Sequence, residues 1–183
     1  MPDTAPSLAR FFDRLVRRSL VDLSIGGDAI ALYLTQLLTR FVRTDYLYAL
    51  RDAAGHRLES VGEMLIEAER SWAFDQPDFD PFRERAVRQH IGDFTLFMSG
   101  IFPEHVARRA SAALYVREGQ HAYQVVADFE RAALRPNARL FAALATDFEQ
   151  YAAALRYMKR VYFRPAGAPP GLRPPLSLLT DLD

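Results

Sequence analysis

The sequence predicts an all-α fold: a single helical domain of about six helices, bundle-like, with a central apolar helix and a Pro-rich C-terminal tail. Three observations predict it. Apolar residues recur every three or four positions, half of the 183 residues are hydrophobic, and capping residues or prolines stand where the periodic segments begin and end. A chain of this length fits one domain, which we place at residues 1–164, with an extended tail at 165–183.

The first two predicted helices cover residues 7–23 and 28–43. Gly26-Gly27 separates them, and Asp28 is suited to cap the second. The next stretch, 45–58, fits either a short helix that ends at Gly55 or a small hairpin that turns there. We favour the helix, because two isolated strands are barely stable in water.

The middle of the chain has the clearest helix boundaries. Ser60 and Glu63 form a capping box before a helix that continues to about residue 72. Asp80 followed by Pro81 is typical of an N-cap and a first helical residue, and opens the central helix, 82–102. That helix ends before Pro103, because proline disfavours the helical conformation of the residue preceding it.

Two long helices are expected after the central one. The first covers 103–134, with a possible bend near Arg109, and stops at Arg135-Pro136. Asn137 then caps a last helix that extends to about residue 163.

The central helix places reactive groups against the core. At about 100° per residue, His90 and Asp93 share one side with Phe94 and Phe97, while Arg85, Arg88, Gly92, Thr95 and Ser99 share the other. A polar group buried without a partner costs about 1–3 kcal/mol, so these two side chains need partners. His90, Asp93, Phe94 and Phe97 are therefore the candidate ligand-binding residues. The alternative is a structural hydrogen-bond network with a Tyr or Arg from another helix.

The last helix and the tail contain the candidate interaction residues. Apolar residues recur at alternating steps of three and four over 140–162, which indicates a coiled-coil-like seam for dimerisation or packing inside the domain's own bundle. The tail is Pro-rich and ends in a Leu-rich acidic segment, which fits either a docking element or a tail that folds back on its own domain. The interaction candidates are Phe141, Leu144, Phe148, Tyr151, Leu155, Leu178 and Leu179.

Composition excludes several classes of function. Lys and Arg number 23 and Asp and Glu also 23, so a general nucleic-acid binder is not expected. The chain has no cysteine, which excludes thiolate catalysis and thiolate zinc sites within it. Neither a signal peptide nor an apolar run of membrane-spanning length is present, so we expect a cytoplasmic protein that does not enter the membrane. The one Glu-x-x-His motif, Glu118 to His121, puts its histidine on the polar helix face; no metal and no cofactor are expected.

The favoured function is a non-enzymatic helical interaction or assembly module that self-associates or binds a protein partner. It rests on the seam, the tail and the lack of a catalytic set. The alternative is a small-molecule-binding protein or enzyme with a pocket around His90 and Asp93, for which the sequence assigns no catalytic residue.

Overall fold

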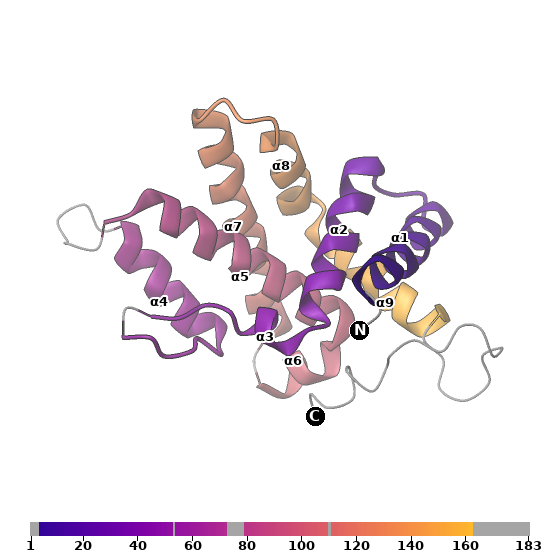
Figure 1. Cartoon of the computed structure of the whole chain (residues 1–183), viewed down its shortest axis with the longest axis horizontal. Coiled ribbons are helices and arrows are strands. Elements are labelled where there is room, and N and C mark those ends of the chain that lie inside the picture. Colours follow the sequence, from indigo (N-terminus) through magenta and orange to yellow (C-terminus); the bar gives the residue numbers. More distant parts are fainter. Residues whose placement is uncertain (1–3, 53, 73–78, 110, 163–183) are drawn as a thin grey trace.

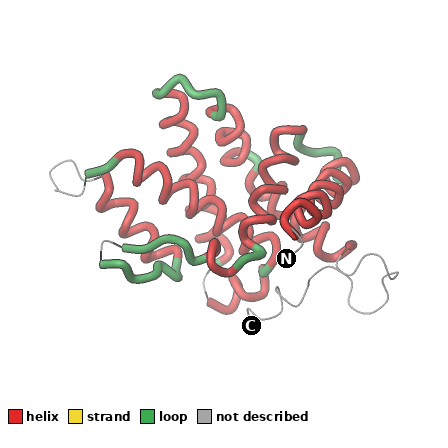
Figure 2. The backbone as a smooth tube through the Cα atoms, in the orientation of Figure 1, coloured by secondary structure: helices red, strands yellow, loops and turns green. Residues whose placement is uncertain are grey.

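The computed structural model describes residues 4–52, 54–72, 79–109 and 111–162, and these fold into helices joined by short loops (Figures 1 and 2). The prediction of an all-α fold is confirmed, since the described residues contain no strand. In chain order the helices are α1 (Thr4–Asp22), α2 (Asp28–Phe41), α3 (Thr44–Leu47), α4 (Val61–Trp72), α5 (Pro81–Ile101), α6 (Pro103–Arg109), α7 (Ala112–Ala132), α8 (Ala138–Thr146) and α9 (Phe148–Tyr162). None of these helices combines the length and apolar character needed to cross a membrane.

The described residues form nine helices rather than about six, because both long predicted helices are divided. The 103–134 segment forms α6 and α7, with Ser111 in extended conformation as the N-cap of α7. The last segment divides at Asp147, whose φ of −104° and ψ of 23° leave the helical region. A Pro-rich tail stays a prediction, since residues 163–183 lie outside the described residues.

The ambiguous segment contains a short helix followed by a turn, so the predicted helix up to Gly55 is wrong. After α3, Arg51 and Arg57 form an isolated antiparallel bridge. Gly55 has a φ of +87°, which glycine adopts readily, and the Asp52 carboxylate accepts hydrogen bonds from the main-chain N–H groups of residues 54 and 56. These local bonds stabilise the turn in place of a longer helix.

Two of the predicted helix starts are confirmed by their hydrogen bonds. Ser60 Oγ accepts from the N–H of Glu63 at 3.2 Å, and the Glu63 carboxylate accepts from the N–H of Ser60 at 3.0 Å. Asp80 accepts from the first N–H groups of α5, with Pro81 at the first helical position. The predicted cap at Asp28 is wrong, because Gly27 is the N-cap of α2 and Asp28 is its first helical residue. Asn137 stands at the predicted N-cap position of α8, but its side chain makes no capping hydrogen bond.

Helix α5 crosses the middle of the domain and is buried on every side from Ile91 to Ile101. The side of α5 that the sequence predicts to be polar is therefore buried between Ile91 and Ile101 rather than exposed to solvent. Small residues explain this, because they let neighbouring helices approach closely. A Cβ atom on Gly92 would lie 2.6 Å from the Tyr123 ring on α7, and one on Gly100 would lie 2.6 Å from Leu155 on α9.

Candidate functional site

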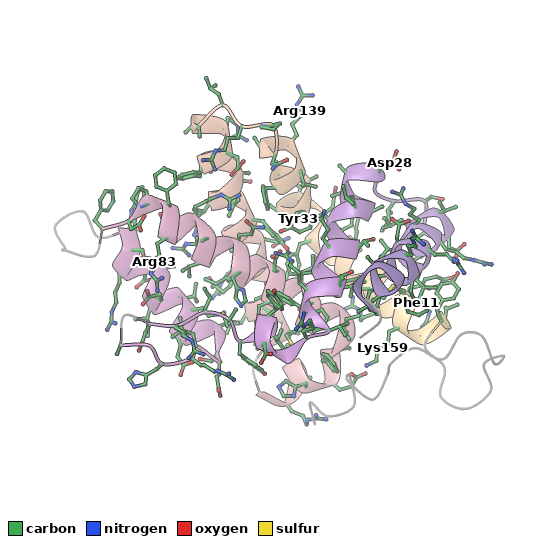
Figure 3. The ribbon with its side chains drawn as sticks, viewed as in Figure 1. Phe11, Asp28, Tyr33, Arg83, Arg139 and Lys159 are labelled. Atoms are coloured by element: carbon green, nitrogen blue, oxygen red, sulfur yellow. The ribbon has the colours of Figure 1, made fainter. Side chains whose placement is uncertain are left out.

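The buried carboxylate of Asp93 connects α5 to two other helices. Asp93 is 2% exposed. Its Oδ1 accepts hydrogen bonds from the hydroxyl of Tyr33 on α2, at 2.6 Å, and from that of Tyr123 on α7, at 2.8 Å. Its Oδ2 accepts from Nη2 of Arg40, also on α2, at 3.1 Å. Figure 3 shows Tyr33 pointing from α2 toward the centre of the domain.

Burial and hydrogen bonding act in opposite directions on this cluster. Burial raises the pKa of Asp93, while the Arg40 guanidinium and the two tyrosine hydroxyls lower it. Burial raises the pKa of Tyr33 and of Tyr123 well above the usual value, and the nearby carboxylate raises both further. The phenols therefore stay protonated at neutral pH and keep donating. Three donors already occupy Asp93, which suits a carboxylate that holds helices together better than a free general base.

A chain of polar contacts runs from this cluster to the far end of α7. Gln89 Nε2 donates to the Tyr33 hydroxyl at 3.2 Å, and the side-chain oxygen Oε1 of Gln89 accepts from Arg85 Nη1 at 2.7 Å. Arg85 Nε donates to the buried Glu130 carboxylate at 2.8 Å, and Glu130 also pairs with Arg135 at 3.5 Å. The polar groups inside this part of the domain are thus paired with one another.

His90 lies in a different environment from Asp93, although the two are three residues apart. Its Nε2 lies 3.1 Å from the main-chain carbonyl of Leu47, which can only accept, so Nε2 carries the hydrogen. Its ring lies beside Phe41 and is stacked with Phe94. Burial lowers the pKa of His90 to about 4, so the imidazole is neutral at neutral pH.

The two predicted aromatic ligand contacts belong to the core. Phe94 is 2% exposed and contacts the rings of Tyr48 and Tyr115. Phe97 is fully buried, with its ring against Phe41 and Phe102. Of the four candidate ligand-binding residues, His90 and Phe94 stack on each other. Asp93 lies apart from them and is bonded to Tyr33 and Tyr123. Tyr33, Arg40 and Tyr123 were not assigned to a site from the sequence.

The candidate interaction residues of the last helix lie in the core of their own chain. All five are at most 3% exposed: Phe141, Leu144, Phe148, Tyr151 and Leu155. They are divided between α8 and α9, so they do not form one continuous seam. Leu178 and Leu179 lie outside the described residues.

Glu118 and His121, the two residues of the Glu-x-x-His motif, have no further carboxylate or imidazole grouped with them among the described residues. Glu118 pairs instead with Arg117 at 2.8 Å. Within the described ranges, no three His, Asp or Glu side chains gather in a way that could hold a metal ion.

An exposed apolar surface lies where α5 begins and α7 ends. Phe82 on α5 is 63% exposed, and its ring lies 5.7 Å from that of Phe129 on α7. Leu134, just after α7, is 93% exposed. The guanidinium of Arg135, the residue after Leu134, lies 5.8 Å from the centre of the Phe129 ring. We call Phe82, Phe129 and Leu134 the α5–α7 apolar surface.

The backbone at Leu134 is unusual for a leucine. Its φ is +55°, in the left-handed region. Leu134 N–H donates to Arg131 O at 3.1 Å and Arg135 N–H to Glu130 O at 2.8 Å, which is the Schellman pattern that ends many helices with glycine. A residue with a Cβ costs about 1–2 kcal/mol in this conformation. The leucine side chain is thus held out into solvent at an energetic cost.

No protein-family model, curated protein or solved structure matches this chain.

Proposed function

We propose that the protein is a non-enzymatic helical assembly module that self-associates through the α5–α7 apolar surface. The observation that carries this proposal is the exposure of Phe82, whose ring contacts Phe129, and of Leu134 just after α7, at 63% and 93%. Aromatic and large aliphatic side chains grouped at one place on a surface are typical of protein–protein contacts.

The conformation of Leu134 supports the same function. Glycine would relieve the left-handed backbone, and leucine gains almost no burial from its own chain in return. A strained residue that carries an exposed apolar side chain is explained if a partner covers that side chain.

A small-molecule site around His90 and Asp93 is the alternative function. A ligand there would have to displace the two phenols and the guanidinium from Asp93, or the Leu47 carbonyl from His90. Because these protein partners already satisfy the site, we favour assembly.

Sedimentation velocity over a range of protein concentrations tests the proposal. We expect the wild-type chain to self-associate, and the variants Phe82→Ser and Leu134→Gly to raise the dissociation constant at least tenfold. Leu134→Gly should at the same time stabilise the fold by up to about 1 kcal/mol, because glycine suits the backbone there. Lost association therefore could not be ascribed to unfolding.

The matched control is Leu32→Ser, which removes an apolar side chain that is 52% exposed on α2. It should leave association unchanged. A wild-type chain that stays monomeric at all concentrations, or surface variants that associate like the control, would refute the proposed function.

A further inference from the structure

The end of the domain formed by α1 and α9 carries an excess of positive charge. Residues 10–18 of α1 contain four arginines and one aspartate, and residues 156–160 of α9 contain three basic residues and no acidic one. The two helices pack against each other, and the hydroxyls of Tyr157 and Tyr162 donate to Asp22 at 3.1 and 3.0 Å. Composition alone does not reveal this excess, because the fold brings together charges that sum to zero over the whole chain.

The arginines of α1 form a stripe on its solvent-exposed side. At about 100° per residue, Arg10, Arg14 and Arg17 lie within about 60° of one another, and Arg18 lies beside them. All four are exposed, whereas Phe12 on the opposite side of the helix is buried in the core. Figure 1 shows α1 at the end of the domain opposite α4, so the stripe lies on the outer edge of the molecule.

Most of the arginines at this end have no carboxylate partner. Arg17 is the exception, since it pairs with Asp13 at 2.9 Å and with Asp28 at 2.6 Å. Four exposed arginines pair with no carboxylate among the described residues: Arg10, Arg14 and Arg18 of α1 and Arg160 of α9. We call these four, together with Arg17, the α1 basic face.

Pairing is common for the arginines in the rest of the described chain. Seven of them contact a carboxylate: Arg40, Arg83, Arg85, Arg88, Arg117, Arg131 and Arg135. Guanidinium groups gathered on one face without such partners leave their charge and their hydrogen-bond donors available to an anion outside the chain.

An exposed apolar side chain stands among these arginines. Val21 lies on the same side of α1 as Arg14 and Arg17 and is 75% exposed, and Leu23, just beyond the helix, is 37% exposed. Guanidinium groups bind phosphate through paired hydrogen bonds, and apolar side chains beside them can enter the boundary between lipid headgroups and acyl chains. We infer that the α1 basic face docks on membranes that contain anionic phospholipids, with Val21 inserted between the headgroups.

A membrane surface accounts for this face better than a nucleic acid does. The arginines could contact phosphate groups in either case, but the phosphate backbone of a nucleic acid offers no apolar surface to Val21. The helix would lie along the bilayer surface, so the contact requires no segment that crosses it. The α1 basic face shares no residue with the α5–α7 apolar surface, and the inference therefore does not depend on the proposed function.

Flotation of the full-length protein with lipid vesicles tests this inference. We expect the wild type to float with vesicles of phosphatidylcholine and phosphatidylserine but not with phosphatidylcholine alone, and the bound fraction to fall as salt is added. The double variant Arg10→Gln and Arg14→Gln should lower the affinity for the mixed vesicles about tenfold. Val21→Ser should lower it about fivefold although the net charge is unchanged.

The matched control is the double variant Arg57→Gln and Arg70→Gln, which removes the same charge from two exposed arginines at the α4 end of the domain. It should bind the mixed vesicles like the wild type. A wild type that fails to float with phosphatidylserine vesicles, or an equal loss of affinity in the control, overturns the inference. A Val21→Ser variant that binds like the wild type also overturns it, because charge alone then explains the contact. If short duplex DNA displaces the protein from the vesicles, the partner is a nucleic acid and the inference is wrong.

Discussion

Gly92→Ala adds one methyl group at the tightest point between α5 and α7. The new Cβ would lie 2.6–2.9 Å from three atoms of the Tyr123 ring. That ring cannot move aside freely, because its hydroxyl donates to Asp93 and the rings of Phe141 and Phe148 pack against it.

The net effect follows from three contributions to the free energy of unfolding. Alanine in a helix interior is favoured over glycine by about 0.5–1 kcal/mol. Forcing a methyl group into a packed core costs about 1–3 kcal/mol. Displacing Tyr123 also weakens its bond to Asp93, and a buried group that loses a partner costs about 1–3 kcal/mol. We therefore expect Gly92→Ala to destabilise the fold by about 2–4 kcal/mol, with a melting temperature roughly 5–15 °C lower.

Urea and thermal unfolding measure this effect, with Gly62→Ala on α4 as the matched control. A Cβ on Gly62 would meet only the Ser60 hydroxyl, at 4.0 Å, so the same substitution should be neutral or stabilising. If Gly92→Ala proves as stable as Gly62→Ala, α5 and α7 do not approach each other at Gly92 as closely as described, and the reasoning is refuted.

Three other substitutions test the buried polar groups. His90→Gln should flatten the fall in stability between pH 6.5 and pH 4, because in that range the unfolded chain protonates His90 and the folded chain, with a pKa of about 4, does not. The wild type should lose about 2–3 kcal/mol relative to this variant in urea unfolding at acid pH; parallel pH profiles would contradict this. Tyr123→Phe should lower the free energy of unfolding by about 1–3 kcal/mol, and a double-mutant cycle with Asp93→Asn should be non-additive; strict additivity would mean the two do not interact. Ser19→Ala should be neutral or stabilising by up to about 1 kcal/mol, because the hydroxyl is buried with no hydrogen-bond partner among the described residues; a clear loss would reveal one.

The helix starts that were predictable depend on local bonds. Ser60 with Glu63, and Asp80 with Pro81, need only three or four consecutive residues to form their bonds, so the pattern alone identifies them. Asp28 has the right residue type for a cap, but its carboxylate pairs with Arg17 of α1 instead. A contact between different helices thus decides its role, and no local pattern contains that information.

The division of the last helix illustrates the same limit. The apolar residues keep their helical spacing through Asp147, so the periodicity shows no interruption there. The chain nevertheless turns between α8 and α9, and both pieces bury their apolar faces in the same core. Periodicity records which residues are buried and cannot show that a helix bends to bury them.

The need of Asp93 for a partner was predictable, but the identity of its partners was not. Its side of the helix is apolar, so donors had to come from another helix. Tyr33 and Arg40 stand seven residues apart and can reach one point from one helix face, but this spacing is common. Only the packing of α2 and α7 on α5 selects them and Tyr123.

The exposed surface was missed because its residues match a core pattern. Phe82 shares the helix side of Asp93 and Phe97, but it stands in the first turn of α5, and its side chain is left mostly uncovered. Leu134 continues the apolar pattern of α7 but lies one residue beyond its C-cap.

The bonds to Asp93 also determine how the helices fit together during folding. Apolar helices can slide along one another by a turn and still bury similar areas. A shift of α2 by one turn, about 5.4 Å, would carry Tyr33 and Arg40 out of reach and leave a charge unpaired in the core. We expect one carboxylate to set the register of three helices whose contributing residues are 30 to 60 positions apart in the chain. Misaligned packings would then be selected against by their unpaired charge rather than by any loss of apolar contact.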